Sequence, residues 1–223
     1  MSSNDSLVNT LYAADCAYQC GCPERAIQIA NPLANDSANP AVSLVAQTIC
    51  LASHIASGRG EDAYNDLLHA IRGCRVGLRC KEDLQLYGVS MLCAMRIETL
   101  VVASIFDFDS FDEDVDMMPF EFKQHLGYLL SMRAMRQNKE QVAVGISYAH
   151  LRTFAKMDDL SRIRLNLVMA AGNMVQGDTN EAEDIFMHAL AMAESSGIVM
   201  PFVETNYFLL GLPRHCQGAS QMI

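Results

Sequence analysis

The stretch that decides the fold reads Gly177-Asp178-Thr179-Asn180-Glu181-Ala182, continues to Ala193, and closes with Gly197-Ile198-Val199-Met200-Pro201-Phe202-Val203-Glu204. Between its two outer glycines, apolar side chains recur at the spacing of an amphipathic helix (Ile185, Phe186, Ala189, Leu190 and Ala193). A glycine ends a helix readily because it adopts the left-handed conformation, and a proline is tolerated in a helix's first turn. The stretch therefore predicts a turn, a helix, a stop and the start of another helix.

The first half of this stretch recurs upstream at a nearly constant interval. A turn position is followed five residues later by an alanine in five places: Gly21–Ala26, Gly58–Ala63, Glu98–Ala103, Asn138–Ala143 and Gly177–Ala182. Subtraction of the turn positions gives intervals of 37, 40, 40 and 39 residues, although Glu98 is not a helix breaker. A period of about 20 to 50 residues marks a helical-repeat array, with an irregular helical bundle as the alternative. The alanine would face the first helix of its pair, where a small side chain permits close packing.

Composition agrees with an all-α protein. Of 223 residues, 51% are hydrophobic and only six are proline, while alanine, leucine and methionine fill most apolar positions. No apolar run is long enough to span a membrane, and residues 1–5 do not begin a secretory signal, so a cytoplasmic protein without membrane attachment is expected. The net charge of −10 argues against direct nucleic-acid binding. The eight cysteines are expected to be reduced thiols.

Periodicity predicts one helical-repeat domain over residues 1–212 and a frayed C-terminal tail over 213–223. Within the domain, residues 72–80 are expected to form a connection broken by Gly73 and Gly77. A long helix should follow from about Lys81 to Ser104.

The turn spacing and the small residues on the second helix resemble the tetratricopeptide repeat, although the period here is longer. The longer period is similar to that of the helical-repeat domain of LuxR-type (MalT-like) transcriptional regulators. The run Ala189–Glu204 resembles the segment "AL-x-LAE-x-x-G-x-x-x-PF-x-(D/E)" near the end of that domain. The resemblance is a repeat pattern over most of the chain and is specific only over residues 177–204. It implies a right-handed α-solenoid of about five antiparallel helix pairs.

The same resemblance implies a non-catalytic sensor or interaction domain. The phosphate-binding pattern G-x-x-x-x-G-K-[ST] of the regulators' ATPase module is not present in this sequence, and no basic helix-turn-helix segment follows Leu212. DNA binding is therefore not carried over, and the partner would be a small-molecule effector or a protein. The alternative is a stand-alone tetratricopeptide-type adaptor that binds another protein. A helical enzyme ranks third.

In such stacks the first helix of each pair lines the concave face. The resemblance therefore implies that side chains about 13, 10, 6 and 3 residues before each turn position would contact a ligand or partner. These positions hold Gln85, Met95, His125, Tyr128, Met132, Met135 and Arg164. The gathering of methionines in mid-chain suits an adaptable apolar groove, with ordinary core packing as the simpler interpretation.

Three further patterns bear on chemistry. Cys16, Cys20 and Cys22 lie close together, but no second ligand pair completes a zinc site, so packing thiols are expected and no metal or cofactor is predicted. The acidic segment 107–116 does not match a calcium-binding loop and is expected to be a solvated loop or a docking segment for a partner. The six histidines accompany no nucleophile motif, so we expect no catalytic residues.

Overall fold

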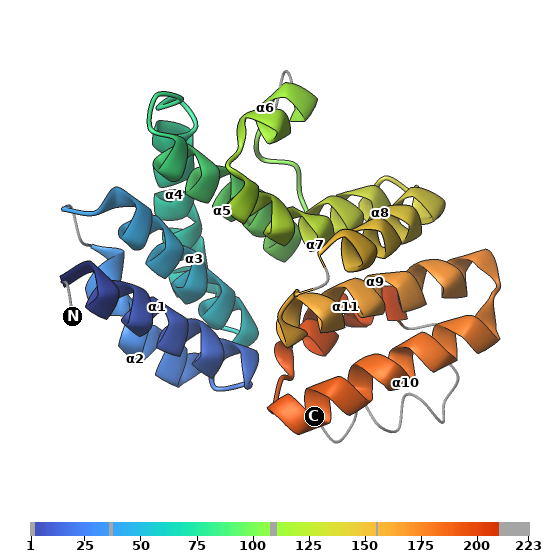
Figure 1. Ribbon diagram of the computed structural model, residues 1–223. Helices are drawn as coiled ribbons and strands as arrows, with labels where there is room; N and C mark the ends of the chain where they lie inside the picture. Colours follow the sequence, from blue (N-terminus) through green and yellow to red (C-terminus); the bar gives the residue numbers. More distant parts are fainter. Residues whose placement is uncertain (1–2, 36–37, 108–110, 155, 210–223) are drawn as a thin grey trace. The chain divides into compact units, whose positions relative to one another are not determined.

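The computed structural model describes residues 3–35, 38–107, 111–154 and 156–209. All regular elements within these ranges are α-helices, which confirms the all-α fold class (Figure 1). The chain divides into two compact units, residues 1–123 and residues 124–223, and each is described by itself.

The first unit is built around its third helix. It contains α1 (Ser3–Gln19), α2 (Pro23–Ala34), α3 (Pro40–Ala56), α4 (Gly60–Gly77), α5 (Leu84–Val101) and the short α6 (Phe111–Met117). Helix α3 contacts α1, α2, α4 and α5. Buried side chains of α3, α4 and α5 form one core together with Phe106, which follows α5; among them are Leu44, Leu51, Ala70 and Ile97.

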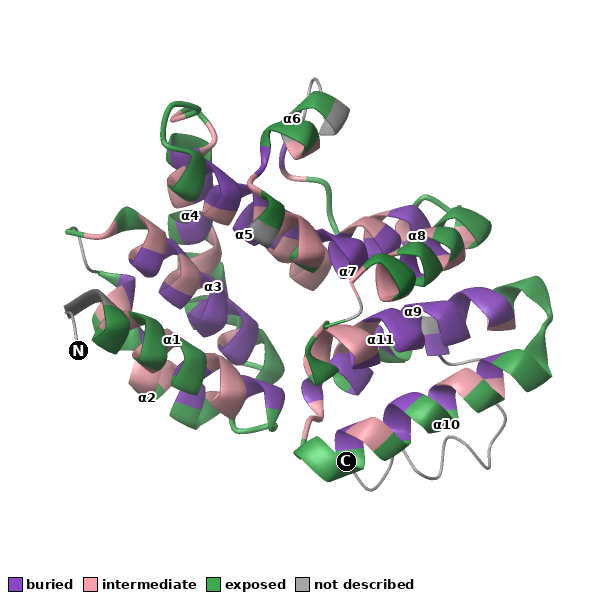
Figure 2. Ribbon diagram, viewed as in Figure 1, coloured by how far each residue is buried: buried purple, intermediate pink, exposed green. Residues whose placement is uncertain are grey.

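The second unit is built around α9. Its helices are α7 (Phe120–Arg136), α8 (Glu140–Thr153), α9 (Asp159–Gln176), α10 (Thr179–Ser196) and α11 (Met200–Leu209), and the boundary between the units falls in the first turn of α7. Helix α9 contacts α8, α10 and α11. Residues 165–173 of α9 are buried without interruption, which Figure 2 shows as a continuous purple ribbon. A helix that is buried on all sides in this way is the centre of its core.

Four turns of the same geometry join consecutive helices into the pairs α1/α2, α3/α4, α7/α8 and α9/α10. The turn residue has a positive φ in each, namely 73° at Gly21, 68° at Gly58, 53° at Asn138 and 90° at Gly177. The next amide donates to the carbonyl five residues before it (Cys22 to Ala17, Arg59 to His54, Lys139 to Ala134 and Asp178 to Asn173, all 2.9–3.0 Å). This is the Schellman motif, which pairs carbonyls that the end of a helix leaves free.

The alanine five residues after each turn begins the hydrogen bonding of the second helix. Its amide donates to the residue just after the turn in all four pairs (Ala26 to Cys22, Ala63 to Arg59, Ala143 to Lys139 and Ala182 to Asp178). All four alanine side chains are buried. The predicted turn and packing alanine are therefore confirmed at four of the five positions.

The fifth predicted turn, at Glu98, is wrong. Glu98 lies inside α5, which ends only at Val101, and the left-handed residue is Val102 with a φ of 53°. The buried Glu98 carboxylate accepts hydrogen bonds from the amides of Ile105 (2.9 Å) and Phe106 (3.0 Å) through Oε1. Glu98 thus holds the chain that leaves the helix, and four of the five predicted positions have the shared turn. Gly197, between α10 and α11, has the same geometry (φ 68°, and a hydrogen bond of 3.2 Å from Ile198 to Ala193), but no alanine follows it five residues later.

The predicted connection over residues 72–80 is wrong for residues 72–77, although residues 78–80 do lie between α4 and α5. Helix α4 continues through both glycines to Gly77. A Cβ at Gly73 would lie 3.1 Å from Leu44 Cδ1, and one at Gly77 would lie 1.8 Å from Ser90 Oγ. Both glycines therefore allow neighbouring helices to approach α4 closely, and neither interrupts it. The following helix, α5, begins at Leu84, slightly later than predicted.

The acidic segment 107–116 is not wholly a loop, because residues 111–117 form α6. Residues 108–110 of that segment lie outside the described residues, and so does the predicted tail over residues 213–223.

Candidate functional site

The structure places the seven predicted groove residues in both units. Gln85 and Met95 lie on α5 of the first unit, and Gln85 is exposed whereas Met95 is buried. The other five lie in the second unit, four on α7 and Arg164 on α9; of these, Tyr128, Met132 and Met135 are buried and His125 is exposed. The buried methionines pack in the cores, as the simpler interpretation expects. A role of these residues in binding stays a prediction.

The second unit brings two of the predicted residues, Tyr128 and Arg164, into contact. The Arg164 guanidinium lies over the Tyr128 ring, 5.1 Å from its centroid. Glu204 of α11 joins them: its Oε2 accepts from the Tyr128 hydroxyl at 3.4 Å and lies 3.9 Å from Arg164 Nη2. The carboxylate and guanidinium are largely buried, with side chains 7% and 16% exposed. The cluster links α7, α9 and α11. The sequence pattern did not predict that Glu204 belongs to it.

His125 borders this cluster. Although its ring reaches the surface, the surrounding protein displaces enough water to lower the pKa of His125. The nearby carboxylate of Asp158 raises that pKa, while the positive charge of Arg164 lowers it. The ring Nε2 lies 3.2 Å from Gln124 Nε2.

We expect the replacement Glu204→Gln to lower the free energy of unfolding by about 1–2 kcal/mol, because it leaves the mostly buried Arg164 without its counter-charge. Chemical denaturation with a circular-dichroism readout measures the loss. The matched control is Glu194→Gln, an exposed site on α10, which should change stability by less than about 0.5 kcal/mol. Equal losses in both variants would mean that the cluster does not contribute to stability.

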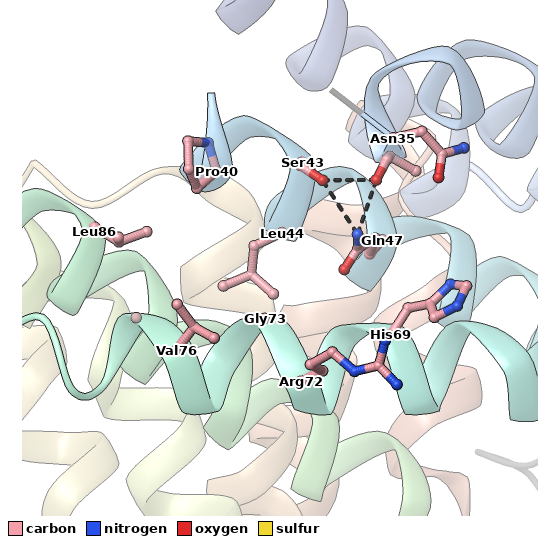
Figure 3. A pocket seen from close by; sticks show the side chains of 12 residues that line it. Asn35, Pro40, Ser43, Leu44, Gln47, His69, Arg72, Gly73, Val76 and Leu86 are labelled. Carbon is pink, nitrogen blue, oxygen red and sulfur yellow. Dashed lines mark hydrogen bonds between the residues drawn. The ribbon is translucent and has the colours of Figure 1, made fainter. Parts of the chain in front are cut away.

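A hollow of about 590 Å³ lies in the first unit, between α3 and α4 and next to the ends of α2 and α5 (Figure 3). Its lining consists of Ala34, Asn35, Pro40, Ser43, Leu44, Gln47, His69, Arg72, Gly73, Val76, Gly77 and Leu86. Most of this lining is apolar. The volume falls within the range of about 300–1,000 Å³ typical of small-molecule sites.

The polar side chains of α3 at the hollow are held by internal hydrogen bonds. Ser43 Oγ donates to the carbonyl oxygen of Ala34 at 2.6 Å, and Gln47 Nε2 donates to the same oxygen at 2.8 Å and to Ser43 Oγ at 3.2 Å. These contacts satisfy the last carbonyl of α2 and fix the wall that Figure 3 shows with dashed lines.

The side chains of α4 at the hollow are basic or apolar. His69, Arg72 and Val76 lie at spacings of three and four residues, so they share one exposed face of the helix. Within the described part of the chain, neither the Arg72 guanidinium nor the His69 ring has a hydrogen bond or ion pair. The lining contains no aspartate or glutamate among the described residues. Sequence reasoning missed this face because it assigned residues 72–80 to a connection.

A histidine–carboxylate pair lies elsewhere in the first unit. His54 Nδ1 is 2.5 Å from Asp66 Oδ2, and His54 Nε2 is 4.0 Å from Asp62 Oδ2. Cys50 lies one helical turn before His54, but burial, and secondarily the charge of Asp66, raises the pKa of its thiol to about 12. A thiol nucleophile must be deprotonated, so this arrangement joins α3 to α4 rather than activating Cys50.

The seven described cysteines are free thiols that differ in exposure. Cys20 and Cys22 are exposed, whereas Cys50, Cys74 and Cys93 are buried. Burial is also the largest factor that raises the pKa of Cys93, to about 11. No group of three or more metal-binding side chains occurs among the described residues, so Cys16, Cys20 and Cys22 do not form one there.

We expect a short pulse of iodoacetamide at about pH 8 to modify Cys22 and Cys20 in the folded protein, and to modify the three buried cysteines only in urea. Exposure favours this order, and burial raises the pKa of the Cys50 and Cys93 thiols. Partial burial and, secondarily, the neighbouring Cys16 and Cys22 also raise the pKa of Cys20. Mass spectrometry of proteolytic peptides resolves each site. Modification of Cys50 as fast as Cys22 in the folded protein would contradict the burial described above.

None of the helices described is both long and apolar enough to cross a bilayer. Comparison with protein-family models, with curated proteins and with solved structures gives no match to this chain.

Proposed function

We propose that this chain is a non-catalytic helical-repeat module that binds a small effector or a protein. The observation that carries the proposal is the set of four turns with one hydrogen-bonding pattern and one packing alanine. Proteins built from repeated helix pairs present extended surfaces, and they typically use them for binding. The hollow in the first unit is a concave site that could receive a small effector.

The resemblance of Ala189–Glu204 to LuxR-type regulators supports a more specific form of the proposal. In that form the module is the sensor or interaction domain of such a regulator in the cytoplasm, stacked as a right-handed solenoid. A ligand that binds one arrangement of the helices better than another would shift the population of the two, and thereby change the output of a separate DNA-binding module. The alternative is a tetratricopeptide-type adaptor.

A thermal-shift screen of the whole chain tests the proposal. Sugars, amino acids, nucleotides, fatty acids and peptide pools are added singly, because a ligand that binds the native state raises the melting temperature. At a concentration about 100 times the dissociation constant, a rise of about 5–10 °C is expected for a chain of this length. A small molecule with that effect favours the sensor, and a peptide favours the adaptor. A flat screen together with a failed pull-down of protein partners would overturn the proposal.

A further inference from the structure

We propose that the hollow of the first unit binds a small organic anion with an apolar body, such as a medium-chain monocarboxylate, and that Arg72 binds its charged group. This inference rests on the proposed function and names the ligand class for that module. It is carried by three features of the hollow: the unpaired cation, the hydrogen bonds that are already made within its wall, and its apolar surface.

The charge of the lining selects an anion. The chain as a whole has a net charge of −10, yet the described lining holds Arg72 and His69 and no carboxylate. A guanidinium can donate two parallel hydrogen bonds to one carboxylate, and Arg72 has no partner among the described residues. A nitrogen of the His69 ring can donate a further hydrogen bond. Figure 3 shows both side chains leaving α4 next to one another.

The hydrogen bonds of the α3 wall select an apolar body. Ser43 Oγ donates to the Ala34 carbonyl, and Gln47 Nε2 donates to that carbonyl and to Ser43 Oγ, so these donors are not free to bind sugar hydroxyls or a nucleobase. The acceptor Gln47 Oε1 has no partner among the described residues, but it is buried from solvent. Leu44, Val76 and Leu86 supply apolar surface in their place. Burial of each methylene group of a ligand against such surface is favourable. A bare inorganic anion would leave most of the hollow unused.

The test titrates the intact chain with octanoate, octanol and octylamine at concentrations where the probes are monomeric. Methyl NMR signals of Leu44 and Val76 report whether a probe occupies the hollow, because both residues line it. We expect saturable shifts with octanoate, binding of octanol about tenfold weaker, and weaker binding still of octylamine. The carboxylate contact with Arg72 is the expected source of the difference.

Three variants on α4 separate the contact of the ligand with Arg72 from a general effect of charge. Arg72→Gln should weaken octanoate binding about tenfold and leave octanol binding unchanged. The control is Arg75→Gln, which removes an equal charge from an exposed position outside the lining and should change octanoate affinity less than twofold. Val76→Glu, at an exposed lining position, should weaken octanoate binding at least tenfold through repulsion. Circular dichroism checks that each variant is folded.

The possible results separate this inference from the proposed function. Equal binding of octanoate and octanol, or an Arg72→Gln variant with unchanged octanoate affinity, would overturn the choice of an anion and leave a binding module with a different ligand. Failure of every octyl probe to shift the Leu44 and Val76 signals would overturn the inference, while the thermal-shift screen and pull-down would still decide the proposed function.

Discussion

Replacing Gly77 by alanine should lower the free energy of unfolding by about 3 kcal/mol, near the upper end of the range for overpacked cores. The new Cβ would lie 1.8 Å from Ser90 Oγ and 2.8 Å from Ser90 Cβ, and neither distance is possible without movement. Rotation of the hydroxyl relieves only the first contact. Helices α4 and α5 must therefore separate, which removes contacts in the core that contains Cys74, Cys93 and Ala94.

Gly60→Ala is the matched control, because Gly60 lies at the other end of α4 and no atom lies within 4 Å of the position of its added Cβ. That variant should be neutral or slightly more stable. When Ser90 is already replaced by glycine, adding Gly77→Ala should cost much less stability than it does in the wild type, because the obstructing side chain is gone. Urea denaturation of the four proteins measures this coupling. A Gly77→Ala variant as stable as wild type would show that α4 and α5 are not in close contact at this point.

The turns of the four pairs could be predicted from sequence because their cause is local. A residue that must adopt a positive φ is usually glycine or asparagine, and Gly21, Gly58, Asn138 and Gly177 have that identity. The alanine five positions later adds a second local signal. Val102 also adopts a positive φ, but valine rarely does so. No sequence pattern therefore indicated this turn, and the prediction placed it wrongly at Glu98.

The hollow could not be predicted because its cause is not local. A glycine in a helical pattern either ends the helix or lets a neighbouring helix approach it, and the outcome depends on residues far away in the sequence. Leu44 and Ser90, which approach Gly73 and Gly77, lie 29 and 13 residues from them by subtraction of their positions. Once α4 is seen to continue through both glycines, His69, Arg72 and Val76 form one face. The Tyr128–Arg164 contact was easier to anticipate, because the repeat pattern had already assigned both residues to the predicted concave face, 10 and 13 residues before their turns.

Phe186→Ala should cost about 3–5 kcal/mol, which is the usual effect of removing a buried aromatic side chain. Phe186 of α10 is only 1% exposed, and its ring meets that of Phe202 on α11 edge to face, with centroids 5.8 Å apart and planes at 86°. Such a pair adds a favourable interaction to the burial of both rings. Both residues belong to the stretch 177–204, so this variant tests whether its helix faces the core as the periodicity predicts. Hydrogen exchange of the α9 and α10 amides, together with urea denaturation, measures the loss in this unit.

Met187→Ala is the control at the adjacent position, because Met187 is 49% exposed and one residue shifts a helix position by about 100°. Its change in stability should stay within about 0.5 kcal/mol. Phe186→Leu should fall between the two, since it keeps an apolar side chain but loses the ring contact with Phe202. If Met187→Ala were the more damaging replacement, α10 would present a different face to α9, and Ala182 and Ala189 could not be the small residues that allow the two helices to pack closely. The order of stability of the three variants therefore tests whether α10 packs against α9 with the face that the repeat pattern of residues 177–204 predicts.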